Sequence, residues 1–182
     1  MPPDIKAALT KLSFSAVAIV VIFVISHFKS ISLTNDIKLV LPSAKLAALW
    51  LVGWVGWVAV AELISVKMGV GRPSSWSDQS VAAIVLLCVG VVVLAPLAEE
   101  LVFRGILYWK IEGTRLGTAG AIAAGAVFFA VLHSQYGLLA IAFILVDGLL
   151  FGLARHHSQT VTLPILMHCI GNSYAAWQRV HT

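Results

Sequence analysis

The chain has 182 residues, of which 60% are hydrophobic and 11% are charged, and its formal net charge is +4. A soluble domain has roughly 45–50% apolar and about 25% charged residues, so this chain cannot cover its surface with groups suited to water. Its basic residues are scattered over short connections and form no stripe, which argues against a nucleic-acid partner and suits anionic lipid. The composition predicts an integral membrane protein that contacts membrane lipid.

Apolar runs long enough to cross a bilayer recur along the chain. A helix needs about 17–25 residues to cross roughly 30 Å of hydrocarbon. Such runs lie at residues 12–28, 44–66, 80–98, 117–133, 138–154 and 160–178. The first run follows two lysines, as in a secretory signal peptide, but no small-residue cleavage site comes after it, so we expect it to be retained. We predict an all-α polytopic membrane protein, a bundle of about six to seven transmembrane helices with an intramembrane polar cavity.

The connections between these runs are too short to form a second domain. We expect residues 1–182 to form a single membrane domain, with two N-terminal spans without motifs at 1–79 and a motif-bearing core at 80–178. Residues 99–110 either continue the third span past Pro96 or form a separate half-helix, because proline removes one backbone hydrogen bond. Lysine and arginine are nearly balanced between the two sides, so the positive-inside rule leaves the orientation open.

Two patterns in the apolar runs indicate packing. Gly148 and Gly152 stand at GxxxG spacing, which lets helix backbones approach closely. Trp50, Trp54 and Trp57 fall on one helical face and are interpreted as lipid-facing or interfacial aromatic residues.

Three charged side chains interrupt the apolar pattern after Pro96, namely Glu99, Glu100 and Arg104. Each costs about 2.5–3.5 kcal/mol at the centre of a bilayer, so they must face protein or water. Glu100 and Arg104 are four residues apart in the favourable acid-first order and can pair. Glu99 lies about 100° round the helix and lacks a local cation, so we expect Glu99 to be the catalyst and the pair to support it. The alternative is an interfacial ion cluster at a helix end.

Two histidines lie in later apolar runs, each with a partner four residues away on the same helical face: Phe129 with His133, and His168 with Asn172. A lone histidine in an apolar helix more often packs than binds, but two of them with a glutamate pair indicate a site. The other four histidines fall in predicted loops or near the terminus and are not expected to take part: His27, His156, His157 and His181.

These residue types suit hydrolysis of a peptide bond inside a membrane, which needs a base, a held water molecule and an oxyanion donor. Glu99 can act as the base, His133 and His168 can hold the water or a metal, and Asn172 can donate to the oxyanion. Glu99, His133 and His168 are also a ligand set that zinc accepts, with water in the fourth position. The HExxH spacing of soluble zinc peptidases is absent, so metal dependence stays open.

Three motifs in this order on successive apolar runs resemble the CAAX prenyl endopeptidase and bacteriocin-processing family, also called CPBP or Abi: Glu99-Glu100-x-x-x-Arg104, Phe129-x-x-x-His133 and His168-x-x-x-Asn172. The resemblance covers roughly residues 80–178. It implies an intramembrane endopeptidase in which Glu99 activates water and Glu100, Arg104, His133, His168 and Asn172 complete the site. Whether such enzymes are zinc metalloendopeptidases or metal-free glutamate peptidases is left open by the motifs.

The resemblance also implies a peptide or protein substrate, which is prenylated in the eukaryotic members. It implies a multi-pass protein of the plasma membrane in a bacterium, or of the endoplasmic reticulum in a eukaryote. Bacterial relatives have diverse targets, including peptide maturation and self-immunity, so the substrate is not inherited with the motifs.

Two other intramembrane peptidase classes fit less well. A rhomboid-like serine peptidase would use Ser173 in Gly171-Asn172-Ser173, but Tyr174 stands where such enzymes carry glycine, and the acids would be unexplained. An aspartyl peptidase needs two facing aspartates, and Asp147 is the only aspartate within a predicted span. We expect Asp147 to hydrogen-bond across helices or to line the cavity.

The alternative from a different class is a non-enzymatic membrane protein, either a proton relay or transporter, or a degenerate immunity or scaffold member. Glutamate and histidine inside a membrane suit proton transfer as well as hydrolysis. Asn172 and Arg104 favour hydrolysis, because a relay would continue as a chain of titratable groups.

Overall fold

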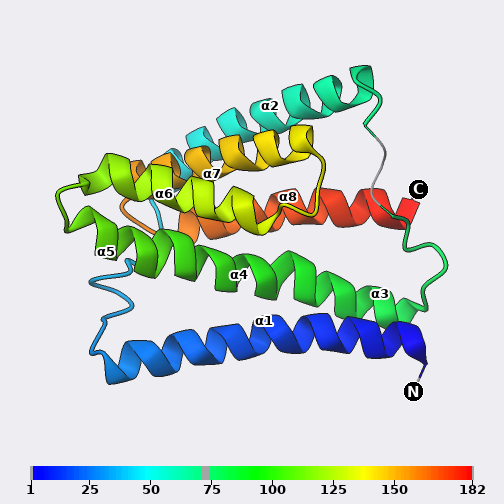
Figure 1. Ribbon diagram of the computed structural model, residues 1–182, viewed down its shortest axis with the longest axis horizontal. Helices are drawn as coiled ribbons and strands as arrows, with labels where there is room; N and C mark the ends of the chain where they lie inside the picture. Colours follow the sequence, from blue (N-terminus) through cyan, green and yellow to red (C-terminus); the bar gives the residue numbers. More distant parts are fainter. Residues whose placement is uncertain (1, 71–73, 182) are drawn as a thin grey trace.

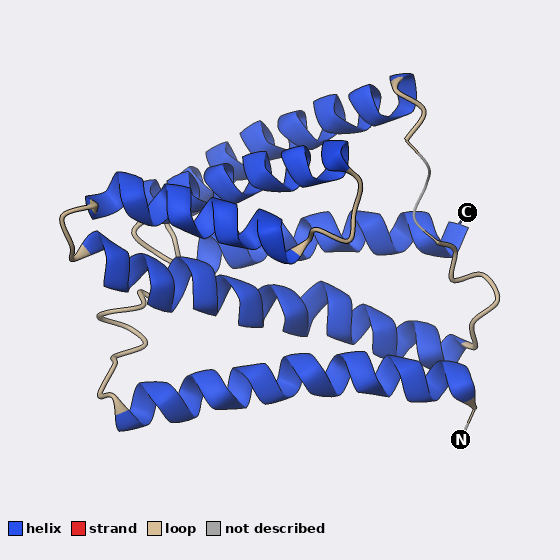
Figure 2. Cartoon of the chain, in the orientation of Figure 1, coloured by secondary structure: helices blue, strands red, loops and turns tan. Residues whose placement is uncertain are grey.

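The computed structural model describes residues 2–70 and 74–181, which form helices and turns without a strand (Figures 1 and 2). The predicted all-α fold is confirmed. Residues 71–73, part of the predicted connection at 69–78, lie outside the described residues.

The described helices form six rods that lie side by side, and the two ends of the chain lie at the same end of the bundle (Figure 1). In chain order the rods are α1 (Pro3–Phe28), α2 (Ala44–Lys67), a composite rod, α6 (Gly117–Leu132), α7 (Leu138–Ser158) and α8 (Thr162–His181). The composite rod consists of α3 (Val81–Cys88), the π-helical segment η1 (Val89–Leu94), α4 (Ala95–Glu100), the π-helical segment η2 (Leu101–Leu107) and α5 (Tyr108–Glu112).

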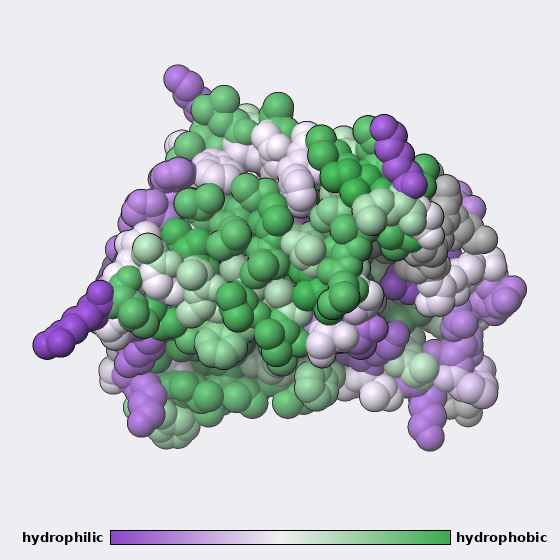
Figure 3. All heavy atoms as spheres, turned by 45° about the horizontal axis from the view of Figure 1, so that its top comes forward, coloured by the Kyte–Doolittle hydropathy of each residue, from purple (hydrophilic) through white to green (hydrophobic). Residues whose placement is uncertain are grey.

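The surface of this bundle is suited to lipid. Large apolar side chains such as Phe14, Val52 and Leu138 are more than 70% exposed, and Figure 3 shows apolar side chains over the middle of the bundle with polar ones toward its ends. Within the described residues, α1, α2, the composite rod and α7 are long and apolar enough to cross a membrane. The chain is therefore an integral membrane protein. The 16-residue α6 is shorter, and α8 is interrupted by polar residues.

The composite rod is continuous for 32 residues, from Val81 to Glu112. Of the two arrangements open from the sequence, residues 99–110 therefore extend the third span past Pro96. Pro96 has no N–H to donate, and the hydrogen bonding of the segment just before it, η1, follows the π-helical pattern. Because no loop separates the two halves, Glu99 and Glu100 lie in the middle of a long helix.

Several helix boundaries differ from the predicted runs. The first helix begins at Pro3 rather than near residue 12, because proline suits the first turn of a helix and the Asp4 carboxylate accepts from the Ser80 hydroxyl at 2.6 Å. At the other extreme, α7 continues to Ser158, so His156 and His157 lie in its last turn rather than in a loop. His157 packs against the Trp50 ring with a centroid separation of 5.5 Å.

The predicted close approach of helix backbones is confirmed where α7 packs on α6. A Cβ atom added to Gly148 would lie 2.8 Å from the Ala126 Cα atom, and one added to Gly152 would lie 2.9 Å from Ile122. Only glycine fits at these two positions, and the contact brings the Gly148 carbonyl close to the composite rod.

The connection between α1 and α2 folds over one end of the bundle. Ile37 is fully buried with Leu101 and Val161, and the Val161 N–H donates to the Lys38 carbonyl at 3.0 Å. The Thr160 hydroxyl donates to the Val40 carbonyl. The α1–α2 connection therefore packs over this end of the bundle.

Candidate active site

Side chains from α2, η1, α4, α6, α7 and α8 line a cavity of about 440 Å³, within the range of ordinary ligand pockets. Four of the six predicted site residues line it: Glu99, His133, His168 and Asn172. The remaining two, Glu100 and Arg104, are buried immediately behind the wall. Helices far apart in the sequence thus bring the three predicted motifs together.

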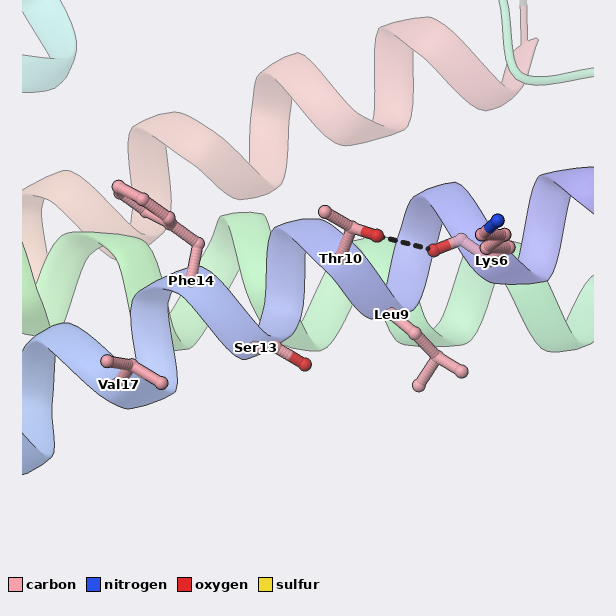
Figure 4. A pocket seen from close by; sticks show the side chains of 6 residues that line it. All are labelled: Lys6, Leu9, Thr10, Ser13, Phe14 and Val17. Atoms are coloured by element: carbon pink, nitrogen blue, oxygen red, sulfur yellow. Dashed lines mark hydrogen bonds between the residues drawn. The ribbon is translucent and has the colours of Figure 1, made fainter.

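A broader hollow of about 840 Å³ runs along the outer face of α1 and is shown in Figure 4. Its lining comes from this one helix and includes Lys6, Thr10 and Phe14, without an acid or a histidine. The Thr10 hydroxyl is already satisfied, since it donates to the Lys6 carbonyl at 2.9 Å. This hollow offers neither a carboxylate nor an imidazole, so the larger volume does not make it the candidate site.

The predicted pair of Glu100 and Arg104 is confirmed and is almost completely buried, at 0% and 1% exposure. The Arg104 Nη1 donates to Glu100 Oε1 at 2.9 Å, and Nη2 donates to the Gly148 carbonyl at 2.9 Å. The guanidinium carbon lies 4.9 Å from the centre of the Phe129 ring and 5.4 Å from that of Phe151. These contacts compensate a charge that would otherwise be costly in the membrane.

His168 connects this buried pair with the cavity. Its Nδ1 lies 2.9 Å from Glu100 Oε1, and its Nε2 lies 3.8 Å from Glu99 Oε2. Because a carboxylate only accepts, Nδ1 carries the proton of that hydrogen bond, and in the neutral ring Nε2 is left as an acceptor facing the cavity side. Glu100 therefore orients His168 as well as pairing with Arg104.

Glu99 differs from its neighbour in every respect that matters for chemistry. Its side chain is 33% exposed, and its nearest titratable neighbour across the cavity is His168, whose Nε2 lies 3.8 Å from Glu99 Oε2, beyond hydrogen-bond distance. A water molecule or a substrate in the cavity can reach this carboxylate, whereas Glu100 is enclosed. The two adjacent glutamates thus face different surroundings, as the sequence predicts from their positions round the helix.

His133 is held at the end of α6, where its Nδ1 donates to the Phe129 carbonyl at 2.8 Å. The Phe129 carbonyl belongs to the last turn of α6, where carbonyls commonly take side-chain partners. The Phe129 ring stands at 90° to that of His168, with 5.6 Å between the centroids. Phe129 therefore separates the two histidines and fixes the wall between them.

Asn172 donates from Nδ2 to the Val91 carbonyl at 2.8 Å. In η1 the Ala95 N–H bonds to the Gly90 carbonyl, five residues earlier. The next acceptor in that ladder is the Val91 carbonyl, and its donor would be residue 96, a proline without an N–H. Asn172 thus supplies the hydrogen bond that Pro96 cannot make, and its second amide hydrogen remains for the cavity.

The tryptophan face of α2 corrects one interpretation from the sequence. Trp54 is 4% exposed, and both Trp54 and Trp57 donate their indole N–H to Asp147 Oδ1 at 3.0 Å. These two rings face α7 rather than lipid, because a part-buried carboxylate within a helix bundle needs donors and the two indoles supply them. Asp147 both hydrogen-bonds across helices and lines the cavity, so both expectations for it are confirmed.

Comparison with known proteins agrees with this geometry. Residues 81–174, just over half of the chain, match the Rce1-like type II CAAX prenyl endopeptidase family. The chain belongs to this family. An Escherichia coli protein described as an uncharacterized 24.3 kDa protein is 32% identical over 127 residues, which cover 65% of this chain and 58% of that protein. The chain thus aligns with less than two thirds of this relative's length. No solved structure gives a significant match.

All six predicted site residues fall inside the segment that matches the Rce1-like family. Outside that segment, α2 carries no motif and still contributes Trp54 and Val58 to the cavity wall. The sequence has no signal for this contribution, because any face of an apolar helix can meet either lipid or protein.

Glu99, His133 and His168, the zinc ligand set predicted from the sequence, all line this cavity, and the use of zinc stays a prediction. Among the described residues, no three histidine, cysteine, aspartate or glutamate side chains are arranged to hold a metal ion together. The Nδ1 atoms of His133 and His168 are both hydrogen-bonded within the protein, which leaves the Nε2 atom of each ring for a water molecule or a metal.

The serine expected of a rhomboid-like enzyme is also misplaced. Ser173 is exposed, and its hydroxyl donates to the Cys169 carbonyl at 2.7 Å. It lines a shallow hollow beside Trp177 rather than the polar cavity. Its neighbour Asn172 faces the cavity instead, which argues against a serine nucleophile.

Proposed function

We propose that this chain is an intramembrane endopeptidase in which Glu99 activates the attacking water. The single observation that carries the proposal is the separation of two adjacent glutamates. Glu100 is enclosed between Arg104 and His168, whereas Glu99 opens onto a polar cavity within a membrane-spanning bundle. Glu99 forms no ion pair with a lysine or arginine of the described residues, and it lies next to a histidine and an amide. A carboxylate with such neighbours is what hydrolysis of a peptide bond needs.

In the proposed reaction, the Glu99 carboxylate takes a proton from water, and the water oxygen bonds to the carbonyl carbon of the scissile peptide. The other hydrogen of this water is accepted by Nε2 of one of the two histidines, His168 or His133, which orients the water. Collapse of the tetrahedral intermediate breaks the C–N bond, and Glu99 returns its proton to the leaving nitrogen. The products are a carboxylic acid and an amine, with the water fully accounted for.

Asn172 is the proposed oxyanion donor. One amide hydrogen is committed to the Val91 carbonyl, which fixes the orientation of the side chain. The second amide hydrogen then points toward the oxyanion without any rearrangement of the side chain. A fixed donor of this kind contributes roughly 10²–10³-fold to the rate.

The proposed substrate is a peptide or protein segment presented at the membrane and carrying a lipid chain. An apolar groove of about 470 Å³ between α2 and α8 shares Trp54, Val58 and Gly171 with the cavity. An apolar groove that shares a wall with the polar cavity suits a substrate with a hydrocarbon chain beside its scissile bond. No step of the proposal passes through a metal.

The test uses detergent-purified protein with a prenylated CAAX peptide, the same peptide without the prenyl group, and an unbiased peptide library. Wild type is expected to cleave, and Glu99→Gln is expected to lose at least about a hundredfold in kcat/KM while its thermal unfolding is unchanged. Zinc is counted in the same samples, and chelation is expected to leave cleavage intact.

Two results would contradict the proposal. Cleavage by Glu99→Gln at the wild-type rate would remove Glu99 from the mechanism. No cleavage of any peptide by well-folded wild type would favour the scaffold or immunity role instead.

A further inference from the structure

Asp147 is a carboxylate inside the bundle that the proposed mechanism does not use. Its Oδ1 accepts from the indole N–H groups of Trp54 and Trp57, both at 3.0 Å, and these bonds join α7 to α2, which lies beside it in Figure 1. Its Oδ2 accepts no hydrogen bond from the described residues and is not enclosed by them. Because Asp147 lines the polar cavity, this second oxygen is reached from the cavity.

The negative charge of Asp147 is held in place without being neutralised. The two indoles are donors without a charge, and no lysine, arginine or histidine of the described residues lies within salt-bridge distance of this carboxylate. Arg104, the buried cation behind the cavity wall, is already paired with Glu100 at 2.9 Å. A charge inside a membrane is costly, and a neutral acceptor such as asparagine could join α2 to α7 equally well. The charge therefore indicates a partner from outside the chain.

The walls of the cavity indicate what kind of partner this is. Five aromatic residues line the cavity together with Asp147: Trp54, Trp76, Phe129, Tyr136 and Phe151. The faces of aromatic rings attract ammonium and guanidinium groups, and a cavity of low dielectric strengthens the attraction of such a group to a carboxylate. A carboxylate in an aromatic cavity thus favours an organic cation.

Asp147 lies close to the proposed catalytic centre. Phe151, one turn further along α7, packs on the His168 ring with 5.5 Å between the centroids. One helical turn is about 5.4 Å, whereas two residues of extended peptide span at most about 7 Å. A substrate cation in contact with Asp147 therefore belongs to a residue within about two positions of the scissile bond.

We propose that Asp147 binds the charged side chain of a lysine or arginine in the substrate, beside the bond that is cleaved near Glu99. The inference rests on the proposed function and adds a specificity determinant to it. The substrate cation donates to Oδ2 in a charge-assisted hydrogen bond, while the two indoles keep Oδ1 in place. The cavity therefore selects segments with a basic residue next to the scissile bond over neutral segments of the same length.

The experiment compares peptides that carry one lysine with the same peptides in which that lysine is acetylated, using purified full-length protein. Acetylation removes the charge and keeps the apolar stem of the side chain. The lysine is placed in turn at the first and second positions on either side of the scissile bond. At one of these positions, wild type is expected to prefer lysine to acetyl-lysine by at least about tenfold in kcat/KM.

Three variants assign this preference to Asp147. Asp147→Asn removes the charge but keeps an oxygen acceptor for the two indoles, and it should reduce the ratio to about one. Asp147→Glu keeps the charge and should retain part of the preference. Asp78→Asn is the matched control and should retain all of it, since Asp78 is an exposed aspartate that does not line the cavity.

The ratio is informative even where a variant folds less well, because loss of folded protein lowers both rates equally. No preference for lysine at any of the four positions in wild type would overturn the cation site and leave the peptidase proposal standing. A preference that persists in Asp147→Asn would also overturn it.

A binding measurement separates the two proposals. Fluorescence anisotropy with the same peptides, labelled, on Glu99→Gln and on the double variant with Asp147→Asn, reports the preference for lysine without turnover. A preference lost in the double variant would support the cation site even if wild type cleaved no peptide, an outcome that would sink only the peptidase proposal. Equal binding of the lysine and acetyl-lysine peptides by Glu99→Gln would overturn the cation site.

Discussion

The two sides of α4 show how differently adjacent residues can be used in a membrane protein. On the buried side, Glu100 is in contact with Arg104 and His168, and Arg104 reaches the Gly148 carbonyl. On the cavity side, Glu99 has no hydrogen bond within 3.5 Å among the described residues and is a third exposed. A rotation of about 100° round one helix separates a charge used for structure from a charge available for chemistry.

This comparison teaches that a buried ion pair can orient a side chain of the cavity wall without itself reaching the cavity. The energetic cost of burying Arg104 is offset by Glu100, a backbone carbonyl and aromatic faces. Because Glu100 also contacts Nδ1 of His168, the same buried layer orients a ring that faces the cavity. The following variants test this difference between the buried side of α4, with Glu100, and its cavity side, with Glu99.

The largest expected effect on stability is that of Glu100→Gln. The amide is nearly isosteric but uncharged, so Arg104 remains buried without a counter-ion, and the free energy of unfolding should fall by about 3–5 kcal/mol. Thermal unfolding in detergent measures this change. Glu99→Gln, one residue away, is the matched control and should unfold like wild type; equal losses in both variants would refute the division between the two sides of α4.

A second comparison tests whether His168 belongs to the cavity side as well as to the buried layer. His168→Ala should reduce kcat/KM by at least about a hundredfold, because the held water loses an acceptor. His156→Ala should change it little, since that ring lies beside the Tyr108 hydroxyl at 3.5 Å, away from the cavity. The reverse order of effects, measured on equal amounts of folded protein, would discredit the site.

The smallest expected effect concerns Asn172 and Pro96. Asn172→Ala leaves the Val91 carbonyl without a donor and should cost about 1–3 kcal/mol of stability. Pro96→Ala supplies the missing N–H, so the double variant should recover stability while its cleavage rate stays low.

Additive losses of stability in that double variant would show that the carbonyl of Val91 is not what Asn172 satisfies. Ser173→Ala is the neighbouring control. Its hydroxyl is exposed and bonds within its own helix, so its effect should stay within about 0.5 kcal/mol.

Local patterns predicted part of the site directly. The pairing of Glu100 with Arg104 follows from their spacing of four residues. That Glu99 lies on a different side of the helix follows from the rotation of about 100° per residue. The close contact at Gly148 and Gly152 follows from GxxxG spacing and is confirmed. The catalytic roles of the six residues, the use of zinc, the substrate and the orientation in the membrane stay predictions.

Contacts between distant helices were not predictable in the same way. Trp54 and Trp57 were interpreted as facing lipid, because an apolar helix gives no signal for which face meets protein. Their acceptor, Asp147, is at least 90 residues away in the chain. The hydrogen bond from Asn172 to the Val91 carbonyl likewise depends on how α8 lies against η1.

The sequence by itself determined that this chain lies in a membrane, because long apolar runs can satisfy their backbone groups in lipid only as helices. It also determined that Glu99, Glu100 and Arg104 share a span, since their spacing is local. Only the tertiary structure decided which of these side chains is enclosed and which is reached from a cavity. The physical reason is that burial depends on packing against α7 and α8, and those contacts join residues far apart along the chain.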